Sequence, residues 1–305
     1  MADVSSTPRV TRRAQARLGV LLVAPLATLV LLFFLLPLAT SIYFSMVDFH
    51  GFEADPAFVG LDNFAELAAD ANVWPALLNN LIWIVAGTVG PLVIGLLVAV
   101  LMWNVRRGST FYKLAFFLPY VLPAAAIGVV WSWIYDPIRG WFNKLLELIG
   151  LGSFQTGWLG NPDTALWAVL VTAIWTATGF VVVIFLAALR NVDPELIDAS
   201  KIDGAGAFQR LVSVILPQIM PVFLMVTTIT LIGGFAVFDI IFVMTGGGPA
   251  DATEVLGTYA YRSAFNLNRM SYGTALALVI TLLAIPFAVG LNRLQRRLSL
   301  YRTGA

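Results

Sequence analysis

Residues 191–217, NVDPELIDASKIDGAGAFQRLVSVILP, are the stretch that decides the fold. Asp193 is a residue type that caps helix N-termini, and Pro194 follows at the first helical position, where its missing N–H costs nothing. Gly204 is the kind of residue that ends a helix, and a second amphipathic stretch then runs to Pro217. The pattern predicts a helix–turn–helix, which is more order than a simple tether needs.

Apolar stretches flank this segment on both sides, each long enough to cross a bilayer, which takes about 20 helical residues. Of the 305 residues, 59% are hydrophobic and 11% charged, too little polar surface for a soluble domain. Lipid offers the backbone no hydrogen-bond partners, and the alternating pattern of a barrel is absent. The sequence therefore predicts an all-α integral membrane protein with six spans, near 18–46, 77–104, 114–135, 165–190, 218–243 and 271–293.

The placement of Lys and Arg orients these spans, because cytoplasmic loops carry the excess of both residues. With the N-terminus inside, the inner segments hold four, three, three and four of the 18 basic residues, and the outer loops together hold four. The first apolar stretch is too long for a signal peptide, and we expect it to be retained. Both termini are expected in the cytoplasm, with an N-terminal segment at 1–17, a membrane domain at 18–293 that includes loop 191–217, and a tail at 294–305.

Several kinds of chemistry are excluded by composition. Cysteine is absent and His50 is the only histidine, which leaves no thiolate chemistry and no His-based metal cluster. No basic stripe with interleaved aromatics supports nucleic-acid binding, and no G-x-x-x-x-G-K-[ST] phosphate loop is present. Among acids, the spans hold Asp239 alone, too little for a catalytic cluster. We expect a conduit with no catalytic residue, no metal and no cofactor of its own.

The spacing inside the decisive stretch carries a resemblance. Asp198-Ala199-Ser200 is followed after three residues by Gly204 and after nine more by Val214-Ile-Leu-Pro217. This is similar to the signature loop of bacterial ABC importer permeases: Glu-Ala-Ala, three residues, Gly, nine residues, Ile, one residue, Leu-Pro. The departures are Asp for Glu, Ser for the second Ala and Val for Ile.

The resemblance implies that this loop is a coupling helix, seated in a cleft of an ATPase subunit. Its contact residues would be Glu195, Asp198, Ala199, Ser200, Asp203, Gly204 and Ala205. The alternative is an amphipathic helix lying on lipid head groups. Such helices are rich in Lys and Arg, whereas this one is largely acidic, which favours the coupling interpretation.

Further stretches resemble the maltose and glycerol-phosphate type of sugar-importer permease. They include Phe58-Val-Gly-Leu-Asp-Asn-Phe64 in the first outer loop and Thr245-Gly-Gly-Gly-Pro249 in the third. The resemblance implies a bacterial plasma membrane protein that pairs with a second permease as a heterodimer. It also implies two copies of an ATPase subunit, which use ATP and Mg, and an extracytoplasmic sugar-binding protein.

A sugar passage needs aromatic faces together with hydroxyl or amide groups. The spans offer Asn79, Trp131, Trp175, Thr178, Thr228 and Asp239, with Asn80, Trp83, Trp133, Tyr135, Thr176, Thr227 and Thr230 as further candidates. A carboxylate within a span is costly, so we expect Asp239 to bond the sugar or gate the outer mouth. Plainer roles stay open, because Trp near span ends often forms interfacial belts and Thr in spans often bonds its own helix.

Two other functions stay open. A permease of the same class could carry another solute, such as an amino acid, a peptide or a polyol phosphate. A phosphate would need buried Arg or Lys, and the spans contain none between their ends. A secondary transporter should show an ion relay or an inverted repeat with broken helices, and it would leave the coupling loop unexplained.

Overall fold

The structure, a computed structural model, describes residues 12–51, 55–103, 105 and 107–303. Of the predicted terminal segments, residues 1–11 and 304–305 lie outside these described residues. Five described helices are long and apolar enough to cross a membrane, or six if one bent pair counts as a span. The expected all-α membrane architecture is confirmed.

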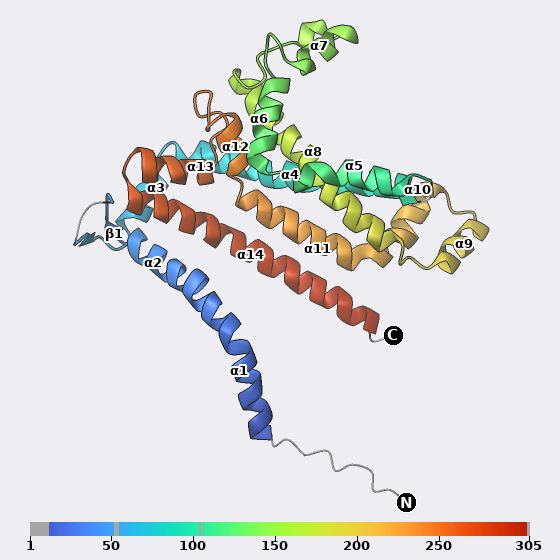
Figure 1. Ribbon diagram of the computed structural model, residues 1–305, viewed down its shortest axis with the longest axis horizontal. Coiled ribbons are helices and arrows are strands. Elements are labelled where there is room, and N and C mark those ends of the chain that lie inside the picture. The colour runs from blue at the N-terminus through green and yellow to red at the C-terminus, as the bar shows by residue number, and fades with distance from the viewer. Residues whose placement is uncertain (1–11, 52–54, 104, 106, 304–305) are drawn as a thin grey trace, which may run out of the picture.

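The elements follow one another as shown in Figure 1. In chain order they are α1 (Arg12–Val30), η1 (Leu31–Leu35), α2 (Leu36–Ser45), β1 (Val47–Asp48), β2 (Ala57–Phe58), α3 (Asp62–Ala69), α4 (Val73–Trp103), α5 (Ser109–Val121), α6 (Ala124–Ile134), α7 (Trp141–Leu148), η2 (Gly152–Phe154), α8 (Pro162–Leu189), α9 (Pro194–Ile202), α10 (Ala207–Arg210), η3 (Leu211–Ile215), α11 (Leu216–Phe235), α12 (Asp239–Met244), α13 (Leu256–Tyr261), η4 (Arg262–Asn266) and α14 (Met270–Thr303). The two short strands pair antiparallel.

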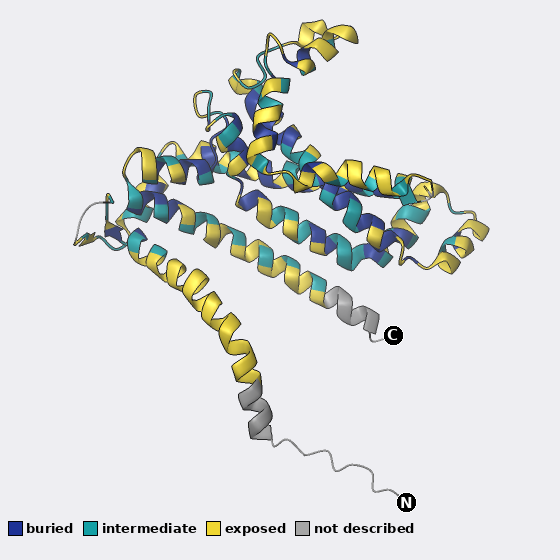
Figure 2. Cartoon of the chain, viewed as in Figure 1, coloured by how far each residue is buried: buried dark blue, intermediate teal, exposed yellow. Residues whose placement is uncertain are grey.

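Helix α8 forms the centre of the bundle and packs against α4, α5 and α11. It is apolar on every side, as expected of a helix with neighbours all around it. Phe185 is fully buried, and its ring stacks on Phe223 of α11 with centroids 5.8 Å apart. A Cβ at Gly95 of α4 would lie 2.6 Å from the side chain of Val181, so only glycine permits this close approach of α4 and α8. Figure 2 shows the buried residues along these central helices, whereas α1 is exposed along its described length.

The third predicted span, 114–135, is not one straight helix. The chain instead forms α5 and α6, which meet at an angle of 99°. Pro123 causes the break, because proline disfavours helical geometry in the residue before it, and Leu122 has ψ 143°. Pro119 within α5 is tolerated without breaking that helix.

The fifth predicted span, 218–243, also needs correction. Helix α11 ends at Phe235, and α12 begins at Asp239 after a short break. Gly234 precedes the break and lies against α4, where a Cβ would come within 3.1 Å of the Ile84 Cα. Asp239 is therefore the first residue of a separate short helix and does not belong to the continuous helix Ala207–Phe235.

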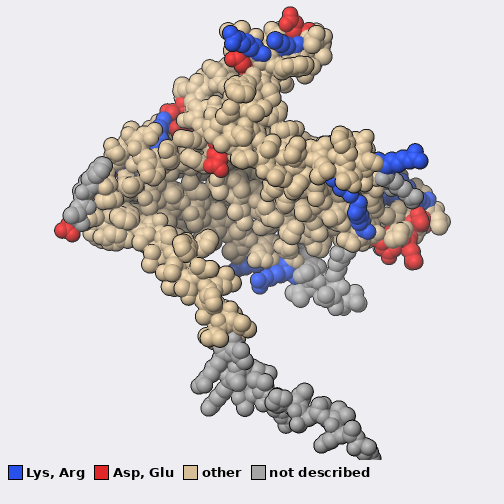
Figure 3. Space-filling view, viewed as in Figure 1, with Lys and Arg blue, Asp and Glu red and all other residues tan. Residues whose placement is uncertain are grey.

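The two ends of the bundle carry different structures. One end holds α9, α10 and the last part of α14, and the other holds the β1–β2 pair, α3 and α13 (Figure 1). The connection from α6 to α8, which includes α7, projects away from the bundle. Charged side chains gather at the ends and on this projection, whereas the wall between them is mostly uncharged (Figure 3).

Candidate functional site

The segment between α8 and α11 has the predicted helix–turn–helix form. Asp193 caps α9 by accepting a hydrogen bond from the Glu195 N–H at 2.9 Å. Gly204 turns the chain with φ +76°, a left-handed conformation that a residue with a Cβ adopts only at a cost. The Gly204 and Ala205 N–H groups donate to the Lys201 and Ser200 carbonyls at 3.1 and 2.9 Å, which completes the end of α9.

The second half of this segment is continuous with a span. Helices α10 and η3 run without interruption into α11, and Ala207–Phe235 forms one apolar helix of 29 residues. Gln218 ties the two halves together, because its Oε1 accepts a hydrogen bond from the Asp193 N–H at 3.1 Å. The sequence analysis missed Gln218, and its only signal was a polar side chain directly after Pro217. This hydrogen bond and the continuous helix connect α9 to α11.

Most of the predicted contact residues are presented to solvent. Glu195, Asp198, Ala199, Asp203 and Gly204 are exposed, whereas Ala205 is half-buried. Ser200 is buried, and its hydroxyl donates to the Ile197 carbonyl at 2.6 Å, which makes it a packing residue of the helix.

Apolar side chains join this exposed set. Ile202 is 87% exposed and Phe208 is 78% exposed, one on each side of the turn. Large apolar side chains held in this way on a capped, rigid turn are typical of a protein–protein contact.

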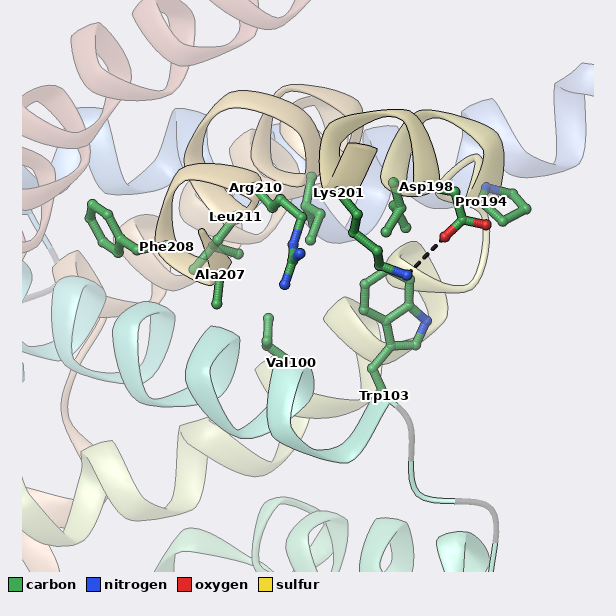
Figure 4. Close-up of a pocket in the computed structure, with 11 residues that line it drawn as sticks. Val100, Trp103, Pro194, Asp198, Lys201, Ala207, Phe208, Arg210 and Leu211 are labelled. Carbon is green, nitrogen blue, oxygen red and sulfur yellow. Dashed lines mark hydrogen bonds and ion pairs between the residues drawn. The ribbon is translucent and has the colours of Figure 1, made fainter. Parts of the chain in front are cut away.

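A cavity of about 670 Å³ lies beneath this turn (Figure 4). Trp103 at the end of α4 faces Lys201 of α9 and Arg210 of α10 across it. Lys201 forms an ion pair with Asp198, with Nζ and Oδ1 2.8 Å apart. Both partners are more than half exposed, so water screens the pair and its contribution to stability is small.

A second cavity, of about 370 Å³, opens where α11 breaks. We call it the central cavity. Residues from α4, α5, α6, α8, α11 and α12 line it: Trp83, Gly87, Tyr120, Ala124, Ile127, Ala173, Thr176, Ala177, Phe180, Ile229, Thr230, Gly233, Gly234, Ala236, Val237, Phe238, Asp239 and Ile240. Tyr120 and Phe180 stack on one wall with ring centroids 4.9 Å apart. Aromatic faces, two threonines, bare glycine backbone and one carboxylate therefore meet in one hollow.

The predicted passage residues are only partly brought together. Of the six residues predicted to line the pathway, Asp239 lines the central cavity. Among the further candidates, Trp83, Thr176 and Thr230 line it as well. Trp175 and Thr178 line a different cavity of about 460 Å³ on the other side of α8. Trp131 packs its ring against Trp175, with centroids 5.4 Å apart.

Two further predicted pathway residues donate hydrogen bonds to backbone carbonyl groups. The Thr228 hydroxyl donates to the Leu224 carbonyl at 2.8 Å, a bond within its own helix. The Asn79 amide donates to the carbonyls of Ala252 and Glu254 at 3.1 and 2.8 Å, which fixes the loop between α12 and α13.

Sequence reasoning missed Tyr120, Phe180 and Gly233, which the structure places in the central cavity beside Gly234. The glycine pair was the available signal, because two adjacent glycines weaken an apolar helix unless a close approach or a ligand needs them. Tyr120 could not be found, since the 99° bend after α5 decides where it lies.

The opposite end of the bundle is a dense polar network. The Asn80 side chain, 2% exposed, accepts a hydrogen bond from the Leu256 N–H at 2.8 Å. The Asp70 carboxylate accepts from the hydroxyls of both Tyr259 and Tyr272. Partial burial raises the pKa of Asp70, but the hydrogen bonds together outweigh this, and the net pKa lies below its usual value.

Glu254 lies beneath the loop from α12 to α13 and is 3% exposed. Burial raises its pKa, and the facing Arg262, 3.1 Å away, offsets this in part. Arg262 also pairs with Asp251 at 2.6 Å, so one guanidinium holds two carboxylates. Among the described residues no His, Cys, Asp and Glu cluster could hold a metal ion.

This fold, with its apolar helices and rigid turn between two of them, defines a multi-pass membrane permease. The chain belongs to the family of binding-protein-dependent transport system inner membrane components, whose model matches residues 91–300. It is accordingly a multi-pass protein of the plasma membrane.

Relatives and solved structures agree with this family. The chain is 36% identical over 281 residues to the diacetylchitobiose uptake system permease protein NgcF of Streptomyces coelicolor, covering 87% of this chain and 78% of that one. It is 32% identical over 272 residues to the sn-glycerol-3-phosphate transport system permease protein UgpA of Yersinia pestis, covering 88% and 90%. Its fold matches a chain in the crystal structure of a bacterial ABC transporter that imports the acidic polysaccharide alginate, with a TM-score of 0.79, 22% identity and coverage of 93% and 96%.

Proposed function

We propose that this chain forms half of the pathway by which an ATP-driven importer takes up an uncharged sugar. The composition of the central cavity is the observation that carries the substrate class. Tyr120 and Phe180 offer flat aromatic faces to the C–H surfaces of a sugar ring. Thr176, Thr230 and Asp239 offer oxygen atoms to its hydroxyl groups.

The charge of the central cavity favours an uncharged sugar over an anion as the substrate. Asp239 is the only charged side chain among the residues that line the central cavity, and it is acidic. A phosphate or carboxylate substrate would meet like charge there, with no Lys or Arg to neutralise it. The relatives include permeases named for a chitobiose derivative and for glycerol phosphate, and the cavity favours the uncharged class.

The charge distribution supports a cytoplasmic position for α9 and both termini. The segment between α2 and α4, which holds Asp48, Asp62, Glu66 and Asp70, and the loop from α12 to α13 then face the outside. An extracytoplasmic binding protein docks on that face and delivers the sugar. A second permease completes the pathway as the other half of a heterodimer.

Two copies of a separate ATPase subunit supply the energy, using ATP and Mg. One of them receives α9, where the exposed Ile202 and Phe208 contact it. Gln218 and the continuous helix Ala207–Phe235 carry the movement of α9 to Thr230, Gly233 and Gly234 at the cavity. Closure of the ATPases thereby changes which side of the membrane the cavity opens to.

A second candidate function is transport of an amino acid or a polyol phosphate by the same kind of machinery. A secondary transporter is disfavoured, because α9 and its turn would then have no partner.

The test is ATPase activity of the complete complex in nanodiscs, with its binding protein and a panel of neutral and phosphorylated sugars. Stimulation by a neutral sugar is expected, and Asp239→Asn should reduce uptake of that sugar without reducing the amount of assembled complex. Stimulation by a phosphorylated solute alone would refute the substrate class while leaving the permease assignment standing. Unchanged uptake in Asp239→Asn would remove Asp239 from the pathway.

A further inference from the structure

Helix α7 presents an apolar face that no described part of the chain covers. Trp141 is 71% exposed, Leu145 44%, Leu148 79% and Ile149 60%. Steps of three and four residues place Trp141, Leu145 and Leu148 on one side of the helix. Glu147 lies about 130° around the helix from the centre of this side, so α7 is amphipathic with an apolar face turned outward.

This face is held rigidly in place. Asn143 on the buried side of α7 donates to the carbonyls of Pro137 and Thr156 at 3.2 and 3.1 Å, and its Oδ1 accepts from the Trp158 indole at 2.7 Å. The rings of Phe142 and Trp158 pack edge to face with centroids 5.0 Å apart. These contacts hold the buried side of α7 against its own connection and leave the apolar face uncovered.

The apolar face continues the wall of a span. A hollow of about 430 Å³ joins Val130, Trp133 and Ile134 of α6 to Trp141 of α7, and the charged Asp136 and Arg139 of the connection line it as well. Trp133 is 71% exposed and Ile138, in the connection between α6 and α7, is 86% exposed. Because α6 belongs to the bent pair that can cross the membrane, its uncovered apolar side faces lipid, and the face of α7 extends that surface.

The position of α7 along the chain fits the membrane surface. It begins seven residues after the end of α6 at Ile134 and precedes α8, whose other end leads to α9. Helix α7 therefore lies on the side of the membrane opposite α9. Exposed tryptophans at the end of a span are typical of the zone between head groups and acyl chains.

We propose that α7 is an interfacial anchor whose apolar face lies in the lipid leaflet on the side opposite α9. Trp133, Trp141, Leu148 and Ile149 enter the boundary between head groups and acyl chains. Lys144, at the edge of the face, extends its amine toward the head groups. Asp136 and Arg139, and likewise Lys144 and Glu147, balance in charge, so the surface does not select anionic lipid.

The anchor gives α6 a fixed point at the membrane surface. Helix α6 contributes Ala124 and Ile127 to the central cavity, and its far end joins α7 through Tyr135, whose hydroxyl donates to the Ala168 carbonyl of α8 at 3.1 Å. The wall formed by α6 and the start of α8 thus stays at a constant depth, and α11 is the wall free to move against it.

The experiment uses spin labels, because the chain has no native cysteine. Leu148→Cys is labelled in the full chain, assembled in phosphatidylcholine nanodiscs with partner subunits stripped of cysteine. Glu147→Cys is the matched control, since it neighbours residue 148 but points about 100° away around α7, off the apolar face. Collisions with oxygen, which enters lipid, are compared with collisions with a water-soluble nickel chelate.

The expected ratio of oxygen to nickel collisions is several-fold higher at 148 than at 147. It should be unchanged when the binding protein is added or when phosphatidylglycerol is included. Equal ratios at the two positions would overturn the anchor. Shielding of 148 from both reagents would assign the face to the second permease, and shielding only after addition of the binding protein would assign it to that partner. A ratio that needs phosphatidylglycerol would refute the charge-neutral interface.

Discussion

The two ends of this permease are built in opposite ways. At one end, Gln218 bonds α9 to the start of α11, and the exposed Asp198–Lys201 pair lies within α9. At the other end, buried Asn80 and Glu254 and half-buried Asp70 bind α4, α13 and α14 to the loops between them. The first end thus presents exposed side chains that suit the proposed contact with a partner subunit. The second end is held together by hydrogen bonds and ion pairs within the chain.

The largest effect is expected from breaking the turn at the first end. In Gly204→Val, a β-branched residue at φ +76° costs on the order of 1–3 kcal/mol, and α9 changes its orientation. We expect sugar uptake to fall about tenfold or more, since 1.4 kcal/mol is already a factor of ten, with little change in Tm.

The control is Gly206→Val, two residues away, where φ is −66° and a Cβ also meets open space. It should retain most of the uptake. Equal loss in both variants would mean that bulk, and not the backbone conformation of Gly204, disturbs the contact.

Substitutions at the second end of the bundle should lower thermal stability and should not act on coupling to the ATPase. Asp70→Ala leaves the hydroxyls of Tyr259 and Tyr272 without their acceptor, and each hydrogen bond to a charged group contributes about 1.5–3 kcal/mol. A marked fall in Tm is expected, measured by thermal unfolding in detergent, whereas the exposed Asp55→Ala should match the wild type.

The pH dependence of Tm gives a further test of the role of Asp70. The folded-state pKa of Asp70 is lowered, so its contribution is present above the unfolded pKa near 3.9 and is lost as pH falls through the folded value. The Tm difference between wild type and Asp70→Ala should therefore stay constant from neutral pH to about pH 4 and shrink only below it. A difference that vanishes already near pH 6 would contradict the assignment.

A smaller loss is expected for Asn80→Ala. The Leu256 N–H would lose its acceptor in a buried position, at a cost of about 1–3 kcal/mol. Leu78→Ala, on an exposed side of the same helix, is the matched control and should lower Tm less. If the two variants unfold at the same temperature, Asn80 does not hold α13 in place.

At the second end, Glu254 is the residue whose substitution should not destabilise the folded protein. Its raised pKa means that the folded state favours the proton, so ionisation lowers stability as pH rises above the unfolded value near 4.3. Glu254→Gln should have a Tm equal to or above that of the wild type at neutral pH, and this advantage should shrink toward pH 4. A clearly lower Tm at neutral pH would show that the pair with Arg262 outweighs burial.

The smallest effect is expected for Asp198→Ala. The ion pair with Lys201 is exposed on both sides, and such pairs contribute about 0–1 kcal/mol. Tm should be unchanged in thermal unfolding. Any loss of uptake would then report contact of Asp198 with the ATPase, and comparison with Asp203→Ala, an exposed acid at the end of the same helix, would show whether the position matters.

Much of the fold follows from local patterns in the sequence. Long apolar runs predict spans, because nothing but a helix satisfies the backbone in lipid. Asp193, Pro194 and Gly204 predict the bounds of α9 to within a residue, because caps and left-handed turns depend only on neighbours along the chain.

The candidate site was less accessible to such reasoning. Pro123 was visible, yet the sequence does not say whether a proline bends a helix slightly or by 99°. Asn79 and Asp239 were equally plausible passage residues from their types alone. Asn79 bonds the backbone of a loop 173 residues away, whereas Asp239 lines the central cavity.

The sequence by itself determined that this chain is a helical membrane protein with a capped, acidic turn between two of its spans. Hydrophobic length, capping and glycine conformation are short-range properties, and each residue carries its own share of them. The tertiary structure alone decided which side chains share the central cavity, and that α7 keeps an uncovered face. Both depend on the angles at which distant helices meet, and those angles are set by packing at positions such as Gly95 and Gly234, far along the chain from the residues that they place.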